Sequence, residues 1–89
     1  MNESVFLFRW ISDFDGTWEE TIEVYKSFND AIVRFKEVQD GMIDEWLKFE
    51  EKHPNRVKKM ESYSNNHAFY QCSILDDFES INIEEYSIR

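Results

Sequence analysis

Residues 13–17 carry the spacing in this sequence that most suggests chemistry. Asp13 and Asp15 stand two positions apart, directly after an apolar run and before Gly16 and Thr17. Two such carboxylates can hold a divalent cation, or one can act as a nucleophile while the other acts as a general acid. The same residues also fit a tight turn, because Gly accepts a positive φ angle and Asp tolerates one.

The pattern Asp-Phe-Asp-Gly-Thr resembles the first motif of the haloacid-dehalogenase-type phosphatases, and Asp76-Asp77 resembles their late acidic pair. In that family the first Asp accepts the phosphoryl group, the second is the general acid, and magnesium lies between them. The family needs a parallel sheet with helical crossovers of about 12 residues or more each, which a chain with one helical segment does not supply. We therefore expect a hairpin turn and no enzyme, and a small metal-dependent hydrolase is only our third hypothesis.

No other set of side chains predicts a metal or cofactor site. His67 and Cys72 lie five positions apart, which places them on opposite faces of a strand, and we expect Cys72 to be a small buried apolar residue. Asp13 lacks the later Glu of an EF-hand loop, and Gly16 and Gly41 are too far apart for a phosphate-binding loop. We expect no cofactor and no bound metal.

The alternation of apolar residues predicts five strands. The first strand is apolar on both faces, which favours a strand paired at both edges. In the second, Trp18, Ile22 and Val24 alternate with polar side chains, which predicts one face on the core and one face in water. The expected strands cover residues 4–11, 18–26, 57–63, 67–75 and 78–88.

A helix is expected between the second and third strands. Ser27 has capping-box spacing to Asp30, and Pro54 ends the segment. Gly41 leaves two alternatives, a break near residues 40–41 or one helix to about Glu51, and the unbroken apolar phase favours one helix. The apolar stripe consists of Phe28, Ile32, Phe35, Val38, Met42, Trp46 and Phe49.

The closing strand changes phase within its length. Ile81 and Ile83 alternate on one face, whereas Tyr86 and Ile88 alternate on the other. A bulge at Glu84-Glu85 would reconcile the two halves, because one extra residue reverses every later side chain. The elements predict one α+β domain over residues 1–89, an antiparallel sheet in the order β-β-α-β-β-β with one long helix on one face. We expect the helix stripe to pack on a sheet face that includes Ile22 and Val24.

Charge gives the strongest indication of function. Nineteen acidic residues against ten basic ones give a net charge of −9, which repels nucleic acid and anionic membranes and favours a basic protein partner. Five of the basic residues fall between positions 48 and 59, and none lies between 61 and 88. The single cysteine and the absence of a leader or membrane segment predict a cytoplasmic protein, either a monomer or a homodimer.

The candidate partner-binding residues are the carboxylates near the predicted hairpins and two tryptophans. Trp10 and Trp18 flank the Asp-Gly turn, where they can act as a binding anchor or as a cross-strand pair. The acidic candidates are Asp13, Asp15, Glu19, Glu20, Glu23, Asp76, Asp77, Glu79, Glu84 and Glu85.

In size, charge and element order the chain resembles small acidic proteins encoded by phages and prophages. The similarity includes the helix start Tyr25-Lys26-Ser27-Phe28-Asn29-Asp30-Ala31-Ile32 and the closing strand Ile81-Asn82-Ile83-Glu84-Glu85-Tyr86. It implies an inhibitor of host defence, such as an anti-CRISPR protein or another DNA mimic, that occupies the basic site of a nucleic-acid-binding protein. The alternative is a small adaptor or homodimeric structural module that binds through a sheet edge or an aromatic patch.

Overall fold

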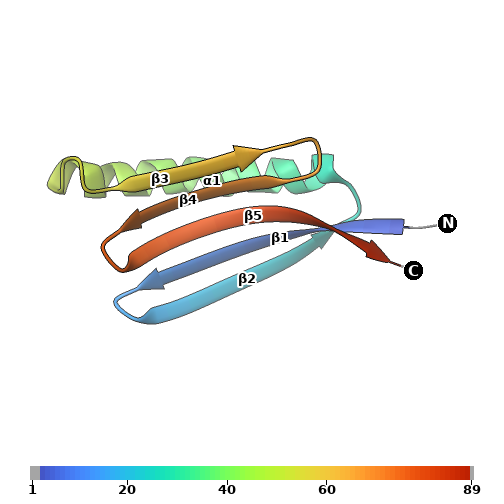
Figure 1. Ribbon diagram of the computed structural model, residues 1–89, viewed down its shortest axis with the longest axis horizontal. Helices are drawn as coiled ribbons and strands as arrows, with labels where there is room; N and C mark the ends of the chain where they lie inside the picture. The colour runs from blue at the N-terminus through green and yellow to red at the C-terminus, as the bar shows by residue number, and fades with distance from the viewer. Residues whose placement is uncertain (1–2, 89) are drawn as a thin grey trace.

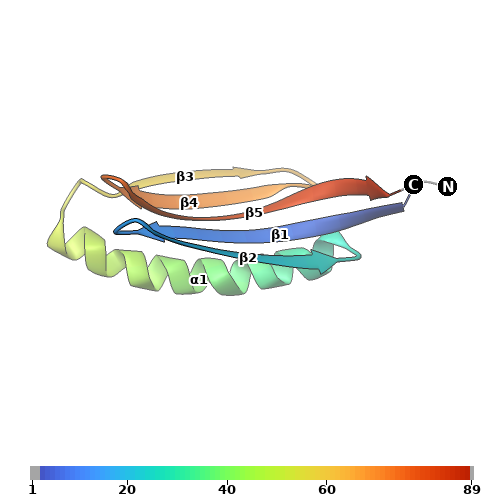
Figure 2. The same ribbon diagram turned by 90° about the horizontal axis from the view of Figure 1, so that it is seen from below.

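The computed structural model describes residues 3–88 as one five-stranded antiparallel sheet with one helix on one face (Figures 1 and 2). This is the two-layer α+β architecture that the sequence predicts. The elements are β1 (Glu3–Phe14), β2 (Thr17–Tyr25), α1 (Phe28–Lys52), β3 (Lys58–Tyr63), β4 (Ala68–Ile74) and β5 (Asp77–Ile88).

The strand order across the sheet is β2-β1-β5-β4-β3, so β1 is paired at both edges, as predicted (Figure 1). The central pair is also the longest, because β1 and β5 each have 12 residues. β2 and β3 form the two edges of the sheet.

The Asp-Gly sequence makes the predicted hairpin. Phe14 pairs with Thr17, which leaves Asp15 and Gly16 as a two-residue turn. Both turn residues have positive φ angles, 53° for Asp15 and 78° for Gly16, as a type I′ turn requires. The phosphatase-like spacing is therefore, in this fold, the turn of a β-hairpin.

Helix α1 begins and continues as the sequence predicts. The Ser27 hydroxyl accepts a hydrogen bond of 3.1 Å from the backbone N–H of Asp30, which satisfies a donor that the first turn leaves free. The helix runs unbroken through Gly41 to Lys52, and the His53 N–H donates to the Phe49 carbonyl at 2.8 Å.

The core lies between α1 and the three central strands. The buried helix residues are Ala31, Phe35, Val38, Met42 and Trp46, and the buried sheet residues are Phe8, Ala68, Tyr70, Cys72, Ile74, Ile81 and Ile83. All of these sheet residues belong to β1, β4 or β5. The burial of Cys72 confirms its predicted role. No helix in the described part of the chain has the apolar character needed to cross a membrane.

The prediction for the apolar face of β2 was wrong. Glu23 lies directly opposite Phe8, which is buried under α1, so Glu23 shares the helix side of the sheet. Ile22 and Val24 therefore stand on the side away from α1, where they are 50% and 63% exposed, together with Trp18. The tight turn sets this register, and a shift of one residue would be needed to turn these side chains toward the helix.

The predicted bulge in the closing strand is also absent. β5 pairs with β1 in regular register past this point, with Glu84 opposite Leu7 and Glu85 opposite Phe6. The change of apolar phase is therefore a change of face: Ile83 packs under α1, whereas Tyr86 lies on the opposite side of the sheet. Figure 2 shows the ends of β1 and β5 extending past α1.

The two glycines make a matched test of this backbone. A Cβ atom added at either Gly16 or Gly41 would meet no atom within 4 Å, so only backbone conformation distinguishes them. Gly41→Ala should raise the free energy of unfolding by about 0.5–1 kcal/mol, because Ala loses less entropy in a helix. Gly16→Ala should lower it by about 1 kcal/mol, because its positive φ disfavours a Cβ. Urea denaturation measures both, and a stabilised Gly16→Ala variant would contradict the turn.

Candidate functional site

The predicted binding residues lie on both faces of the sheet and toward both ends of its strands. Trp10, Glu19 and Glu23 lie on the helix side with Glu79, whereas Trp18, Glu20, Asp13 and Glu84 lie on the opposite side. Trp10 and Trp18 therefore do not form a cross-strand pair. Glu85 lies toward the other end of β5, where its carboxylate accepts a hydrogen bond of 3.1 Å from the Asn66 side chain.

Two hairpin turns meet at one end of the sheet. The backbone N–H of Asp15 donates to the Asp77 carboxylate at 3.0 Å, which joins the β1–β2 turn to the β4–β5 turn beside Asp76. Next to this contact, Trp18 packs edge to face on Phe78 with 6.0 Å between ring centroids. Within residues 3–88, no three His, Cys, Asp or Glu side chains gather closely enough to hold a metal ion.

Carboxylates of β2, β5 and α1 come together on the helix side of the sheet, beside Trp10 of β1. Two adjoining hollows there, of about 420 and 400 Å³, share Trp10 and Glu79 in their walls. We call this surface the acidic groove and define it by Trp10, Ser12, Glu19, Thr21, Arg34, Glu37, Asp44, Glu45 and Glu79. Arg34 is the single basic side chain among the described residues that line it.

Glu79 joins the groove to the core. Its two carboxylate oxygens each accept an indole N–H, from Trp10 at 2.7 Å and from Trp46 at 3.0 Å. Trp46 is only 1% exposed, so its N–H needs a partner within the protein. A charged acceptor makes these hydrogen bonds stronger than neutral ones, and it fixes Trp10 as a wall of the groove.

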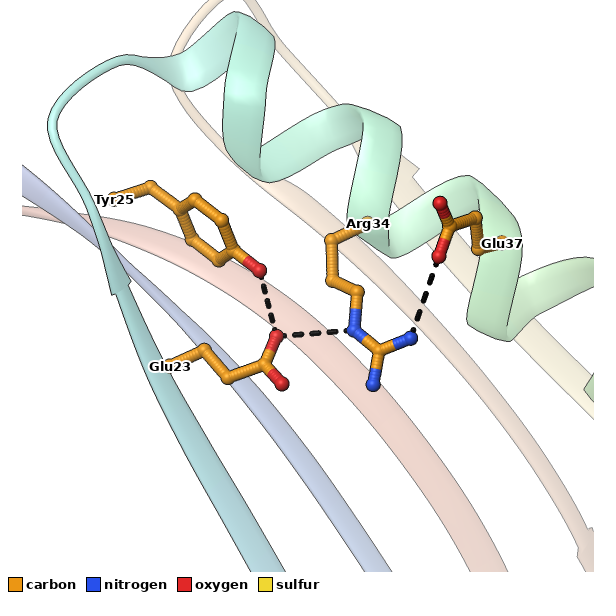
Figure 3. A network of polar contacts seen from close by, with 4 residues as sticks. All are labelled: Glu23, Tyr25, Arg34 and Glu37. Carbon is orange, nitrogen blue, oxygen red and sulfur yellow. Dashed lines mark hydrogen bonds and ion pairs between the residues drawn. The ribbon is translucent and has the colours of Figure 1, made fainter.

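Arg34 lines one of the two hollows of the acidic groove. Figure 3 shows its side chain between Glu23 of β2 and Glu37 of α1. Its Nε lies 3.0 Å from a Glu23 oxygen, and its Nη1 lies 3.4 Å from Glu37. The centre of the guanidinium group lies 6.0 Å from the Trp10 ring centroid and 5.9 Å from that of Phe8, within cation–π range. The fold thus already holds one guanidinium group between carboxylates and an indole.

The same network shifts the pKa values of Glu23 and Tyr25. The hydroxyl of Tyr25 donates to Glu23 at 2.7 Å, and this bond, followed by that from Arg34, holds the pKa of Glu23 below its ordinary value of 4.5. The bond to Glu23 also raises the pKa of Tyr25 above 10.0. Glu23 therefore stays ionised at neutral pH, with its charge directed toward Arg34.

Sequence reasoning missed the residues that α1 contributes to the groove. Glu37, Asp44 and Glu45 come from α1, and none of them was a candidate. The sequence signal that could have found them is their spacing from Arg34 and Gly41. Residues three, four, seven or eleven positions apart lie along one side of a helix. The basic cluster near the helix end is partly paired, with Lys59 2.7 Å from Glu50 and Lys48 3.6 Å from Glu45.

Comparison of the chain with protein-family models, with curated protein sequences and with solved structures found no match.

The Glu23 network predicts a specific dependence of stability on acid. Because the folded pKa of Glu23 lies below the unfolded value near 4.5, its ionised form stabilises the fold above that pH, and the effect is lost as pH falls through the folded pKa. Glu23→Gln should therefore be less stable than wild type at neutral pH, and the two should converge in stronger acid. Urea unfolding between pH 7 and about pH 3 measures the difference. A stability gap between Glu23→Gln and wild type that persists unchanged into acid would contradict this assignment.

Proposed function

We propose that this chain is a non-enzymatic binding protein whose acidic groove receives a basic segment of a partner protein. The observation that carries the proposal is the gathering of Glu19, Glu37, Asp44, Glu45 and Glu79 around Trp10 with one cation among them. Carboxylates around the half-buried Trp10 wall are complementary to arginine, which pairs with carboxylates and stacks on indole rings.

Arg34 supports the choice of a guanidinium group as the ligand. It makes within the chain the contacts that a partner's arginine would make farther along the same groove, an ion pair with carboxylates and a cation–π contact with Trp10. The other end of the groove, beside Ser12 and Glu19, offers carboxylate and hydroxyl acceptors of the same kind. Lysine would gain the ion pair but less of the planar stacking.

The partner class follows from charge. Carboxylates spaced along a groove suit a surface of Lys and Arg, which is the surface that binds phosphate backbones. A protein with net charge −9 is steered toward such a surface over long distances. The proposed partner is therefore a basic nucleic-acid-binding protein whose DNA or RNA competes with this chain. The resemblance to phage-encoded inhibitors of host defence supports the same assignment.

Fluorescence anisotropy with a labelled octa-arginine peptide tests the groove directly. Wild-type protein should bind the peptide and release a short DNA duplex from it. Raising salt from about 50 mM to about 500 mM should weaken binding roughly tenfold or more, because exposed charges are then screened.

Two charge reversals separate the groove from the overall charge. Glu19 lies in the groove on edge strand β2, whereas Glu61 lies on the other edge strand, β3, where it is exposed on the same side of the sheet. The two variants are Glu19→Lys and Glu61→Lys. Both change the net charge equally, yet only Glu19→Lys should slow association with the peptide several-fold. Equal effects of the two variants, or binding that is indifferent to salt, would rule out the groove as the binding site.

A further inference from the structure

The side of the sheet away from α1, which we call the open face, carries a second surface with different chemistry. Alternate residues of all five strands point to this side. Eleven of them are large and apolar: Val5, Leu7, Ile11, Trp18, Ile22, Val24, Met60, Phe69, Phe78, Tyr86 and Ile88.

Nothing in the described chain covers the open face. None of these eleven side chains is buried, and Trp18, Val24 and Met60 are each more than half exposed. By contrast, the helix-side residues of β4 are all buried. Soluble monomers rarely leave a continuous apolar surface of this extent in water, so the open face has the character of an interface.

Charge is largely kept off the open face. Only Glu3, Asp13, Glu20 and Glu84 of the nineteen acidic residues stand on it, together with the basic residues Arg9 and Lys58. Arg9 lies 3.2 Å from Glu20, and its neighbours across the sheet are Asn82 and Ile22. Four acidic and two basic residues leave this face with a net charge of −2 of the chain's −9, so it can meet a copy of itself with much less repulsion than the whole charge would cause.

The size of the open face also fits a dimer. At about 4.8 Å between strands and about 3.3 Å per residue, the five strands present roughly 700 Å², close to the ~800 Å² per partner of a standard interface. We propose that two copies of this chain pack open face to open face as a symmetric β-sandwich. The two helices and the two acidic grooves then lie on the outside, so this interface is independent of the proposed arginine site.

The sheet edges favour face packing over extension of the sheet. Edge strand β3 carries Lys58 and Lys59, and edge strand β2 carries Glu19, Glu20 and Glu23. Charged side chains on an edge oppose pairing between like strands. Pairing of β2 with β3 of another copy would match the charges, but it would produce open-ended chains of molecules instead of a closed dimer.

Sedimentation velocity over a range of concentrations tests the proposal with a matched pair of valines. Val24 on the open face is 63% exposed, and Val33 on α1 is 60% exposed. Wild type should show a reversible monomer–dimer equilibrium. Val24→Glu should raise the dimer dissociation constant at least about tenfold, because a carboxylate would be buried in the interface, whereas Val33→Glu should leave it unchanged.

Folding of each variant is checked by far-ultraviolet circular dichroism. If Val24→Glu does not fold, Met60→Glu repeats the test on another strand of the open face, where Met60 is 59% exposed. The proposal is overturned if wild type stays monomeric at about millimolar concentration, or if it forms open-ended oligomers. It is also overturned if the open-face variant and the helix variant weaken dimerisation equally.

Discussion

One helix covers a sheet that is wider than the helix and has two faces. Five strands about 4.8 Å apart span roughly 24 Å, whereas a helix with its side chains is only about 10–12 Å across. The buried sheet residues accordingly come from β1, β5 and β4 alone. The surfaces left uncovered include the acidic groove along β2 and the whole open face.

Acidic and apolar side chains alternate along β2, and this gives the two surfaces different chemistry. Glu19 and Glu23 point to the helix side, and Trp18, Ile22 and Val24 point to the open face. Glu79 strengthens the division, because it places a carboxylate in the groove while its oxygens accept hydrogen bonds from a core indole and a groove indole. Charge and apolar area are thus sorted onto different sides of one sheet, which is why we assign them to different partners.

Local signals predicted the local structure well. The Asp-Gly turn, the Ser27 cap and the apolar phase through Gly41 each depend on neighbouring residues, and each appears as expected. The face of β2 and the course of β5 could not be predicted in this way. Apolar residues occur on both sides of this sheet, so hydrophobicity alone does not reveal which side the helix covers. The groove depends on that choice too, and its helix residues come together with Glu79 only through tertiary packing.

The three tryptophans lie in three different parts of the structure. One nuclear magnetic resonance experiment therefore tests most directly whether the acidic groove and the open face bind independently. Trp18 lies on the open face, Trp10 in the acidic groove and Trp46 in the core. The indole N–H signal of Trp18 should shift on dilution but not on addition of octa-arginine peptide, and that of Trp10 should shift with the peptide but not on dilution. Trp46 donates to the same Glu79 carboxylate as Trp10, so its signal should follow that of Trp10. If dilution and peptide addition shift the same indole signal, or if neither shifts any signal, the claim that the sheet carries two independent binding surfaces is contradicted.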